Sequence, residues 1–102
     1  MATNNTARLR DVQISNWRTH ESKTLRGFFT VTLPSGMVIN DCMLHRKEDR
    51  RWIGLPSREY SVQGERKFAP LVSFVDREAE QRFHYQVLAA LDREKPWEGQ
   101  NT

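Results

Sequence analysis

Residues 37–61 read MVINDCMLHRKEDRRWIGLPSREYS, and this stretch decides the fold. It predicts a strand over Met37–His45, a charged hairpin loop over Arg46–Arg50, and a second strand over Arg51–Leu55 that Pro56 stops. The first strand has apolar residues on both faces: Val38, Cys42 and Leu44 on one, Met37, Ile39 and Met43 on the other. A strand of this kind is usually covered on both sides, so we expect a partner subunit to supply the second cover.

The segment before this stretch shows the clearest alternation in the chain. Thr24–Leu33 predicts a strand whose inward face carries Leu25, Gly27, Phe29, Val31 and Leu33, and whose half-open face carries Arg26, Phe28, Thr30 and Thr32. Leu33-Pro34-Ser35-Gly36 then fits a tight β-turn, because proline suits its second position and glycine its fourth. Further upstream, Leu9–Trp17 predicts a first strand and Arg18–Lys23 a polar connection.

The segment after the stretch changes from strand to helix. Ser57–Lys67 is expected to be a polar excursion, and Phe68–Val75 a fifth strand, with Pro70 placing its start at an edge or bulge. Asp76 is a good N-cap for a helix that should run to about Arg93. The apolar stripe of this helix consists of Ala79, Phe83, Val87, Ala90 and Leu91.

The predicted fold is therefore α+β, with an about five-stranded, mostly antiparallel sheet and one C-terminal amphipathic helix. A chain of 102 residues suits one domain, which we place at residues 8–93 between tails at 1–7 and 94–102. A domain of this size buries only a thin core, and a homodimer would add to it.

Composition bounds the class of protein. Apolar residues make up 37% of the chain and charged residues 28%. No apolar run approaches the roughly 18 residues of a membrane span, and residues 1–11 lack the apolar region of a secretory signal. The single cysteine, Cys42, cannot form an intramolecular disulfide, so we expect a reducing, cytoplasmic location.

A search for reactive groups favours a protein that is not an enzyme. Cys42 and His45 have C-x-x-H spacing, but on a strand they should point to opposite faces, so neither a metal site nor another cofactor is expected. His20, His45 and His84 suit surface or boundary positions better than general bases, and no phosphate-cradling loop is present. We expect no small-molecule substrate. A substrate-sized pocket holding His84 or His45 beside a carboxylate would revive the enzyme hypothesis.

The distribution of charge is more informative than the net charge of +3. Residues 1–70 contain 12 Lys+Arg and 7 Asp+Glu (net +5), whereas residues 71–102 contain 4 and 6 (net −2). Arginine, whose planar fork suits phosphates and base edges, outnumbers lysine 12 to 4. Trp52, Tyr60 and Phe28 are candidate stacking surfaces for unpaired bases, although Trp52 also suits core or dimer packing. The Arg46–Arg51 turn also suits a solvated hairpin tip, partly neutralised by its own acidic residues.

Three short segments then carry a family resemblance. Val38-Ile39-Asn40-Asp41-Cys42, the corner Trp52-Ile53-Gly54-Leu55-Pro56-Ser57-Arg58, and Phe68-Ala69-Pro70-Leu71 before a C-terminal helix resemble the SpoVG (stage V sporulation protein G, or septation protein) family. The similarity extends over residues 8–92 and includes Leu9-Arg10-Asp11-Val12. It implies a dimeric bacterial or phage nucleic-acid-binding regulator, with Arg58 at the family's basic corner and Glu59 where a second basic residue often stands. The family's helix corresponds to residues 76–93, with Arg93 as a further candidate contact.

These observations together predict a SpoVG-like homodimer that binds DNA or RNA through an arginine-rich surface. The predicted contact residues are Arg46, Lys47, Arg50, Arg51, Arg58, Arg66, Lys67, Arg77 and Arg82. The alternative is a phage or mobile-element interaction module that binds a host protein through an exposed sheet face or the helix. No membrane partner is expected.

Overall fold

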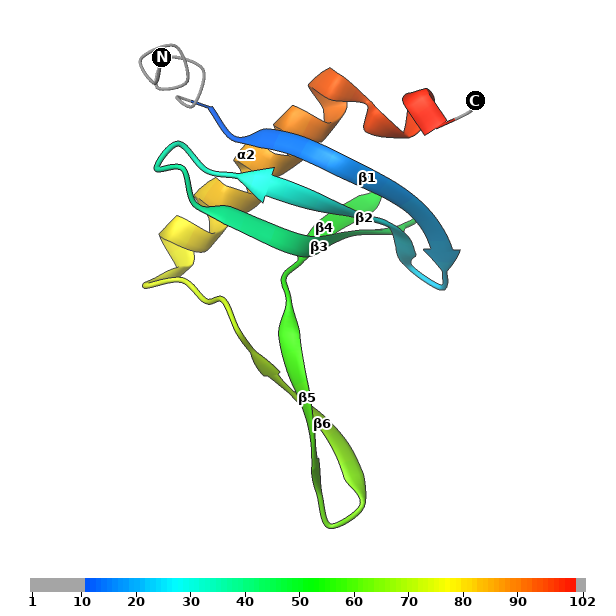
Figure 1. The fold of residues 1–102 in the computed structure, drawn as a ribbon, viewed down its shortest axis with the longest axis vertical. Helices are drawn as coiled ribbons and strands as arrows, with labels where there is room; N and C mark the ends of the chain where they lie inside the picture. Colours follow the sequence, from blue (N-terminus) through cyan, green and yellow to red (C-terminus); the bar gives the residue numbers. More distant parts are fainter. Residues whose placement is uncertain (1–10, 101–102) are drawn as a thin grey trace.

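The computed structural model describes residues 11–100 (Figure 1). The elements in chain order are β1 (Gln13–Ser22), β2 (Leu25–Thr32), β3 (Val38–Lys47), β4 (Arg50–Gly54), β5 (Ser57–Val62), β6 (Glu65–Pro70), α2 (Arg77–Glu94) and the 3-10 helix η1 (Pro96–Gln100). Strands β1 to β4 form an antiparallel sheet in sequence order, and β5 and β6 form a separate antiparallel pair. The α+β class, the antiparallel sheet and the C-terminal helix are confirmed, but residues 11–100 contain six strands where five were predicted.

Helix α2 covers one face of the four-stranded sheet (Figure 1). Its N-cap is Asp76, whose side chain accepts a hydrogen bond of 2.8 Å from the backbone N–H of Ala79. The helix ends where Lys95 takes a left-handed conformation (φ 44°). Four of the five residues predicted to form its apolar stripe are buried, and Ala79 is half-buried. The core also includes Val12, Ile14, Trp17, Phe29, Val31, Ile39, Cys42, Leu44 and Ile53.

A β-bulge corrects the predicted faces of β3. Phe29 pairs with Cys42 and Val31 with Ile39, so β3 contains one more residue than β2 across this interval. Asp41 takes a positive φ of 59° within it. The extra residue brings Ile39 onto the same buried face as Cys42, whereas Val38, predicted to share that face, is 52% exposed.

Strand β1 differs from the prediction in where it ends and in containing a bulge. β1 runs through Ser22, because the polar segment 18–22 pairs with β2. A bulge at Asn16 (φ 56°) keeps Trp17 on the buried side with Ile14. The predicted tail at residues 1–7, and Leu9 and Arg10 of the predicted first strand, lie outside the described residues.

The C-terminal half contains the larger corrections. The predicted polar excursion at residues 57–67 instead forms most of the β5–β6 hairpin, which projects from the body (Figure 1). The predicted fifth strand is also wrong beyond Pro70, because residues 71–76 cross back to α2 without strand pairing. Part of the predicted C-terminal tail forms η1, whose Trp97 packs at the margin of the core. Within residues 11–100, no helix is both long and apolar enough to cross a membrane.

Candidate nucleic-acid interface

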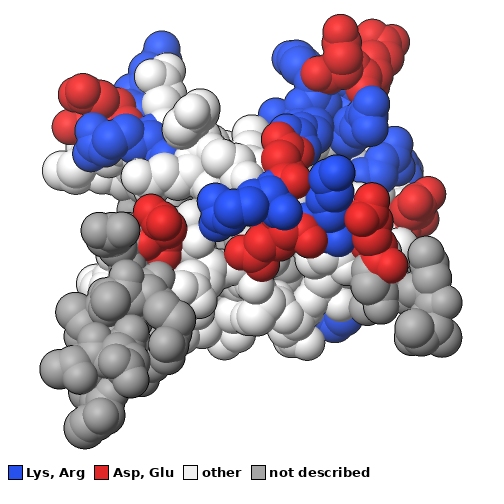
Figure 2. All heavy atoms as spheres, turned by 90° about the horizontal axis from the view of Figure 1, so that it is seen from above, with Lys and Arg blue, Asp and Glu red and all other residues white. Residues whose placement is uncertain are grey.

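Two turns of the sheet lie side by side and gather positive charge. The backbone N–H of Arg46 donates to the carbonyl oxygen of Thr24 at 2.7 Å, which joins the β1–β2 turn to the end of β3. Figure 2 shows Lys and Arg gathered over this end of the molecule, with Asp and Glu among them. We call this cluster the basic end; it consists of Lys23, Arg26, Arg46, Lys47, Arg50 and Arg51. The first two were not among the predicted contacts, because their position depends on the pairing of β1 and β2 with β3.

Strand alternation divides the four predicted cations of the β3–β4 turn between two faces. Leu44 pairs with Ile53 on the helix side, and Arg46 pairs with Arg51 two residues further along the same face. Lys47 and Arg50 pair on the opposite, open face. The turn itself is only Glu48 and Asp49, shorter than the predicted loop at 46–50.

Arg51 is fixed by helix α2. Its two terminal nitrogens donate to the two carboxylate oxygens of Asp92 at 2.8 and 2.9 Å. This bidentate hydrogen bonding raises the pKa of Arg51 and lowers the pKa of Asp92. Arg51 is therefore half-buried and already paired, which makes it a weaker candidate for a phosphate contact than Lys47 or Arg50.

The open face of the sheet carries a set of rings that we call the ring face: His20, Phe28, His45 and Trp52. The rings of His45 and Trp52, paired across β3 and β4, lie nearly parallel, with centroids 5.4 Å apart and planes at 6°. The guanidinium of Arg50 lies 5.5 Å from the Trp52 ring centroid. Trp52 is thus a half-buried residue of the open face and does not belong to the core.

Phe28 extends the ring face toward β1. It lies 5.8 Å from the ring of His20 and 5.6 Å from the guanidinium of Arg18, measured to ring centroids. Arg18 also forms an ion pair of 3.2 Å with Asp41, so part of its charge is neutralised.

His45 is held as a neutral ring. Burial lowers its pKa, which keeps the ring neutral near pH 7. Its Nδ1 atom lies 3.0 Å from the hydroxyl oxygen of Thr24.

The three predicted cations of the hairpin lie on an element that projects away from the sheet (Figure 1). Arg66 pairs with Glu59 at 3.0 Å and Lys67 with Glu65 at 3.4 Å. Arg58 lies over Tyr60, at 6.0 Å from the ring centroid. Two of the three charges are therefore matched within the hairpin, and Tyr60 does not join the ring face.

The predicted cations of α2 are also separate from the basic end. Arg82 lies 3.9 Å from Glu78 in an i,i+4 pair, and both side chains are exposed. Arg77, the first residue of the helix, lines a hollow beside the base of the hairpin. The structure thus places four of the nine predicted contacts at the basic end, on two faces of the sheet, and adds Lys23 and Arg26 to that end.

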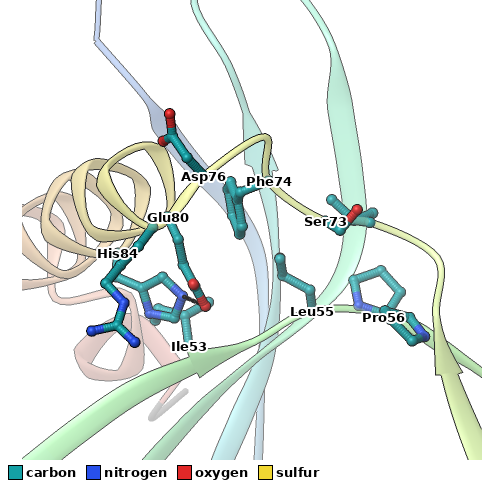
Figure 3. Close-up of a pocket in the computed structure, with 11 residues that line it drawn as sticks. Ile53, Leu55, Pro56, Ser73, Phe74, Asp76, Glu80 and His84 are labelled. Atoms are coloured by element: carbon teal, nitrogen blue, oxygen red, sulfur yellow. Dashed lines mark ion pairs between the residues drawn. The ribbon is translucent and has the colours of Figure 1, made fainter.

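The hollow beside Arg77 contains the histidine and carboxylate on which the enzyme alternative depends (Figure 3). It has a volume of about 550 Å³, and His84 lines it with Nε2 4.0 Å from the carboxylate of Glu80. It is therefore a substrate-sized pocket that holds His84 beside a carboxylate, as the enzyme hypothesis requires. Ser73 also lines it, but within residues 11–100 no hydrogen bond joins Ser73 to His84, and Asp76 is engaged as the helix cap. No nucleophile–base pair is assembled among these residues.

Cys42 and His45 occupy opposite faces of β3, as predicted. The Cys42 side chain is buried in the core, with Sγ 3.7 Å from the carbonyl oxygen of Ile39. Burial, assisted by the nearby charge of Asp41, raises the pKa of the thiol to about 11. Across the described part of the chain, no group of three His, Cys, Asp or Glu side chains is placed to hold a metal ion.

Comparison of the chain with protein-family models, curated proteins and solved structures finds no match. The resemblance to the SpoVG family therefore stays a prediction from the quoted segments.

Proposed function

We propose that this chain is a SpoVG-like regulator that binds single-stranded DNA or RNA across the ring face. The observation that carries the proposal is the position of two ring clusters, Phe28 with His20 and Trp52 with His45, on an open sheet face beside Lys47 and Arg50. Aromatic rings beside a basic groove are the combination by which proteins bind unpaired bases, since every base has a face that can stack.

The position of the rings on an open sheet face favours binding of a single strand over binding of a duplex. Bases inside a duplex are stacked on one another, so rings on a sheet face can reach them only after unpairing. Arg50 covers part of Trp52, but an exposed cation–π contact is worth only about 0.5–1 kcal/mol. A stacked base gains about 1–3 kcal/mol, so a base can displace the guanidinium toward a phosphate.

The test is a titration of a labelled oligonucleotide, as single strand and as duplex, at 50 and 200 mM salt. If two to three cations each neutralise one phosphate of a single strand, affinity should fall roughly 7- to 18-fold across this range. Trp52→Ala should weaken single-strand binding about 5- to 150-fold. Arg82 was also a predicted contact, but it is paired with Glu78 on α2 and lies apart from the ring face, so Arg82→Gln is the charge-matched control and should change little. Failure of the single strand to bind at 50 mM salt would overturn the proposal.

We further propose a homodimer formed through the hairpin β5–β6. An isolated two-stranded hairpin is at best marginally stable in water, and this one exposes Phe68 (60%), Val62 and Tyr60. Pairing with a second copy would cover these side chains and the unpaired strand edges. The same hairpin supports the alternative, a module that binds a host protein.

Light scattering coupled to size exclusion distinguishes the two. The dimer predicts twice the chain mass and a monomer for Phe68→Ser, while Tyr85→Ser, an exposed helix position, leaves the mass unchanged. A monomeric mass at all concentrations would contradict the dimer and would favour the alternative, in which the hairpin binds a host protein.

A further inference from the structure

A second hollow lies on the helix side of the basic end, on the opposite face of the sheet from the ring face. It has a volume of about 360 Å³ and combines three arginines with an apolar floor. We call it the arginine pocket; its main lining residues are Arg26, Arg46, Arg51, Trp17, Trp97 and Leu44. We infer that this pocket binds a nucleoside monophosphate, with the ring against the tryptophans and the phosphate on the arginines.

The floor is built around a residue without a side chain. A Cβ atom at Gly27 would lie 2.5 Å from Cζ2 of Trp17, so glycine is what allows the indole to lie against β2. Trp97 from η1 meets Trp17 edge-on, with centroids 5.6 Å apart and planes at 68°. Two indoles from opposite ends of the chain thus form an apolar surface suited to a planar ring.

A bulge supplies the third arginine. Strict alternation predicts that Arg26 lies on the open face with Phe28, but Leu25 pairs with His45 and Gly27 with Leu44. One extra residue of β2 therefore stands opposite β3, and the side chain of Arg26 lines the arginine pocket instead. Re-aiming a side chain is a known effect of β-bulges, which are common beside functional sites.

The charges of the pocket are not balanced. Arg46 and Arg51 are direct cross-strand partners, and like charges in that position repel. Asp92 neutralises Arg51. Among the described ion pairs, Arg26 and Arg46 have no carboxylate partner, and Glu21, which also lines the pocket, forms none with any of the three arginines.

The two unmatched arginines are also held in place by backbone carbonyl oxygens. Nε of Arg46 donates to the carbonyl oxygen of Glu48 at 2.9 Å, and one terminal nitrogen of Arg26 donates to that of Lys23 at 3.2 Å. These bonds hold each side chain and leave its other N–H groups for an acceptor. A phosphate monoester accepts such paired donors, and its negative charge complements the two arginines that lack a carboxylate partner.

The ligand chemistry has two sources, a free nucleotide or the 5′-terminal nucleotide of a strand. The inference does not depend on binding at the ring face. The experiment uses adenosine 5′-monophosphate, adenosine, inorganic phosphate, and a 12-nucleotide strand with and without a 5′-phosphate. Tryptophan fluorescence and calorimetry on the full chain report binding.

The expected result is saturable binding of the monophosphate, at least five-fold tighter than either adenosine or inorganic phosphate. Arg26→Gln with Arg46→Gln should weaken it at least ten-fold. Arg46→Lys, which keeps the charge but loses the fork, should weaken it by a smaller factor. Arg82→Gln is the surface control, and melting curves confirm that each variant is folded. A strand that binds more tightly with its 5′-phosphate indicates the strand end, and equal binding of the two strands indicates the free nucleotide.

Two results would overturn the inference: no saturable binding of the monophosphate, or equal binding by folded wild type and the double glutamine variant. Trp52→Ala separates this site from the ring face, because it should weaken the 5′-hydroxyl strand and leave the monophosphate unaffected. If the monophosphate binds and the 5′-hydroxyl strand does not, the proposed function fails while the arginine pocket stands. If the 5′-hydroxyl strand binds and the monophosphate does not, the inference about the arginine pocket fails while the proposed function stands.

Discussion

Gly27→Ala adds only one methyl group, but it should lower the free energy of unfolding substantially. The added Cβ would lie 2.5 and 2.6 Å from Cζ2 and Cη2 of Trp17 and 2.9 Å from the carbonyl oxygen of Arg18. The indole cannot move away easily, because it is 8% exposed, donates to the hydroxyl of Thr19 at 2.8 Å and packs on Phe29. Overpacking of this kind costs about 1–3 kcal/mol.

This loss of stability is large enough to measure by thermal and urea denaturation. For a domain of this size each kcal/mol lowers Tm by roughly 4–8 °C, so the expected decrease is roughly 4–24 °C. Gly54→Ala is the matched control, since its Cβ would meet the Met43 methyl at 3.1 Å and the His45 ring at 3.2 Å. Both neighbours are side chains of the open face, and this variant should lose less than about 1 kcal/mol.

A double-mutant cycle identifies the cause. Phenylalanine lacks the two ring atoms nearest the new methyl group, so Trp17→Phe should remove much of the additional cost of Gly27→Ala. A clash with Trp17 is not the cause if Gly27→Ala and Gly54→Ala have the same Tm, or if the free-energy changes at positions 17 and 27 are simply additive.

Three further outcomes follow from the fold. Asp92→Asn should lower the free energy of unfolding by about 0.5–1 kcal/mol at pH 7, because it breaks a partly exposed ion pair with Arg51. The pKa of Asp92 is lowered in the folded state. Urea titrations should therefore show the full difference above the ordinary carboxyl pKa and a shrinking difference as the pH falls through the folded-state pKa. A difference that does not shrink as the pH falls below the ordinary carboxyl pKa would contradict this. Burial and a pKa of about 11 should make Cys42 react slowly with a thiol reagent at pH 8 until denaturant is added, and equal rates would show an accessible thiol. Asp76→Ala should cost about 1 kcal/mol by removing the N-cap, whereas Asp76→Asn should retain most of the stability.

Local patterns in the sequence were sufficient for several elements. Alternation located β2, proline and glycine located the turn at 33–36, in which the N–H of Gly36 donates to the carbonyl oxygen of Leu33 at 2.8 Å, and a cap with an apolar stripe located α2. Each of these depends on residues near one another in the chain. The hairpin β5–β6 was missed because its exposed, polar strands lack the alternation that burial on one face imposes.

The candidate sites depended on information that is not local. The bulges at Asn16, Asp41 and Arg26 shift which side chains share a face, and a bulge becomes visible only once two strands are in register. The contiguous charge at residues 46–51 could be recognised from sequence, but its division between two faces required the pairing of β3 with β4. Trp97 gave no signal, because it lies beyond a helix-ending proline in a short polar segment.

The division of the β3–β4 turn between two faces also has a thermodynamic consequence. Arg46 and Lys47 are neighbours in sequence but belong to different surfaces, separated only by the thickness of one sheet. A phosphate held by one of them lowers the positive potential at the other, so filling either surface should weaken the other without any change of conformation. Such antagonism is equal in both directions, and it fades as salt shortens the screening length.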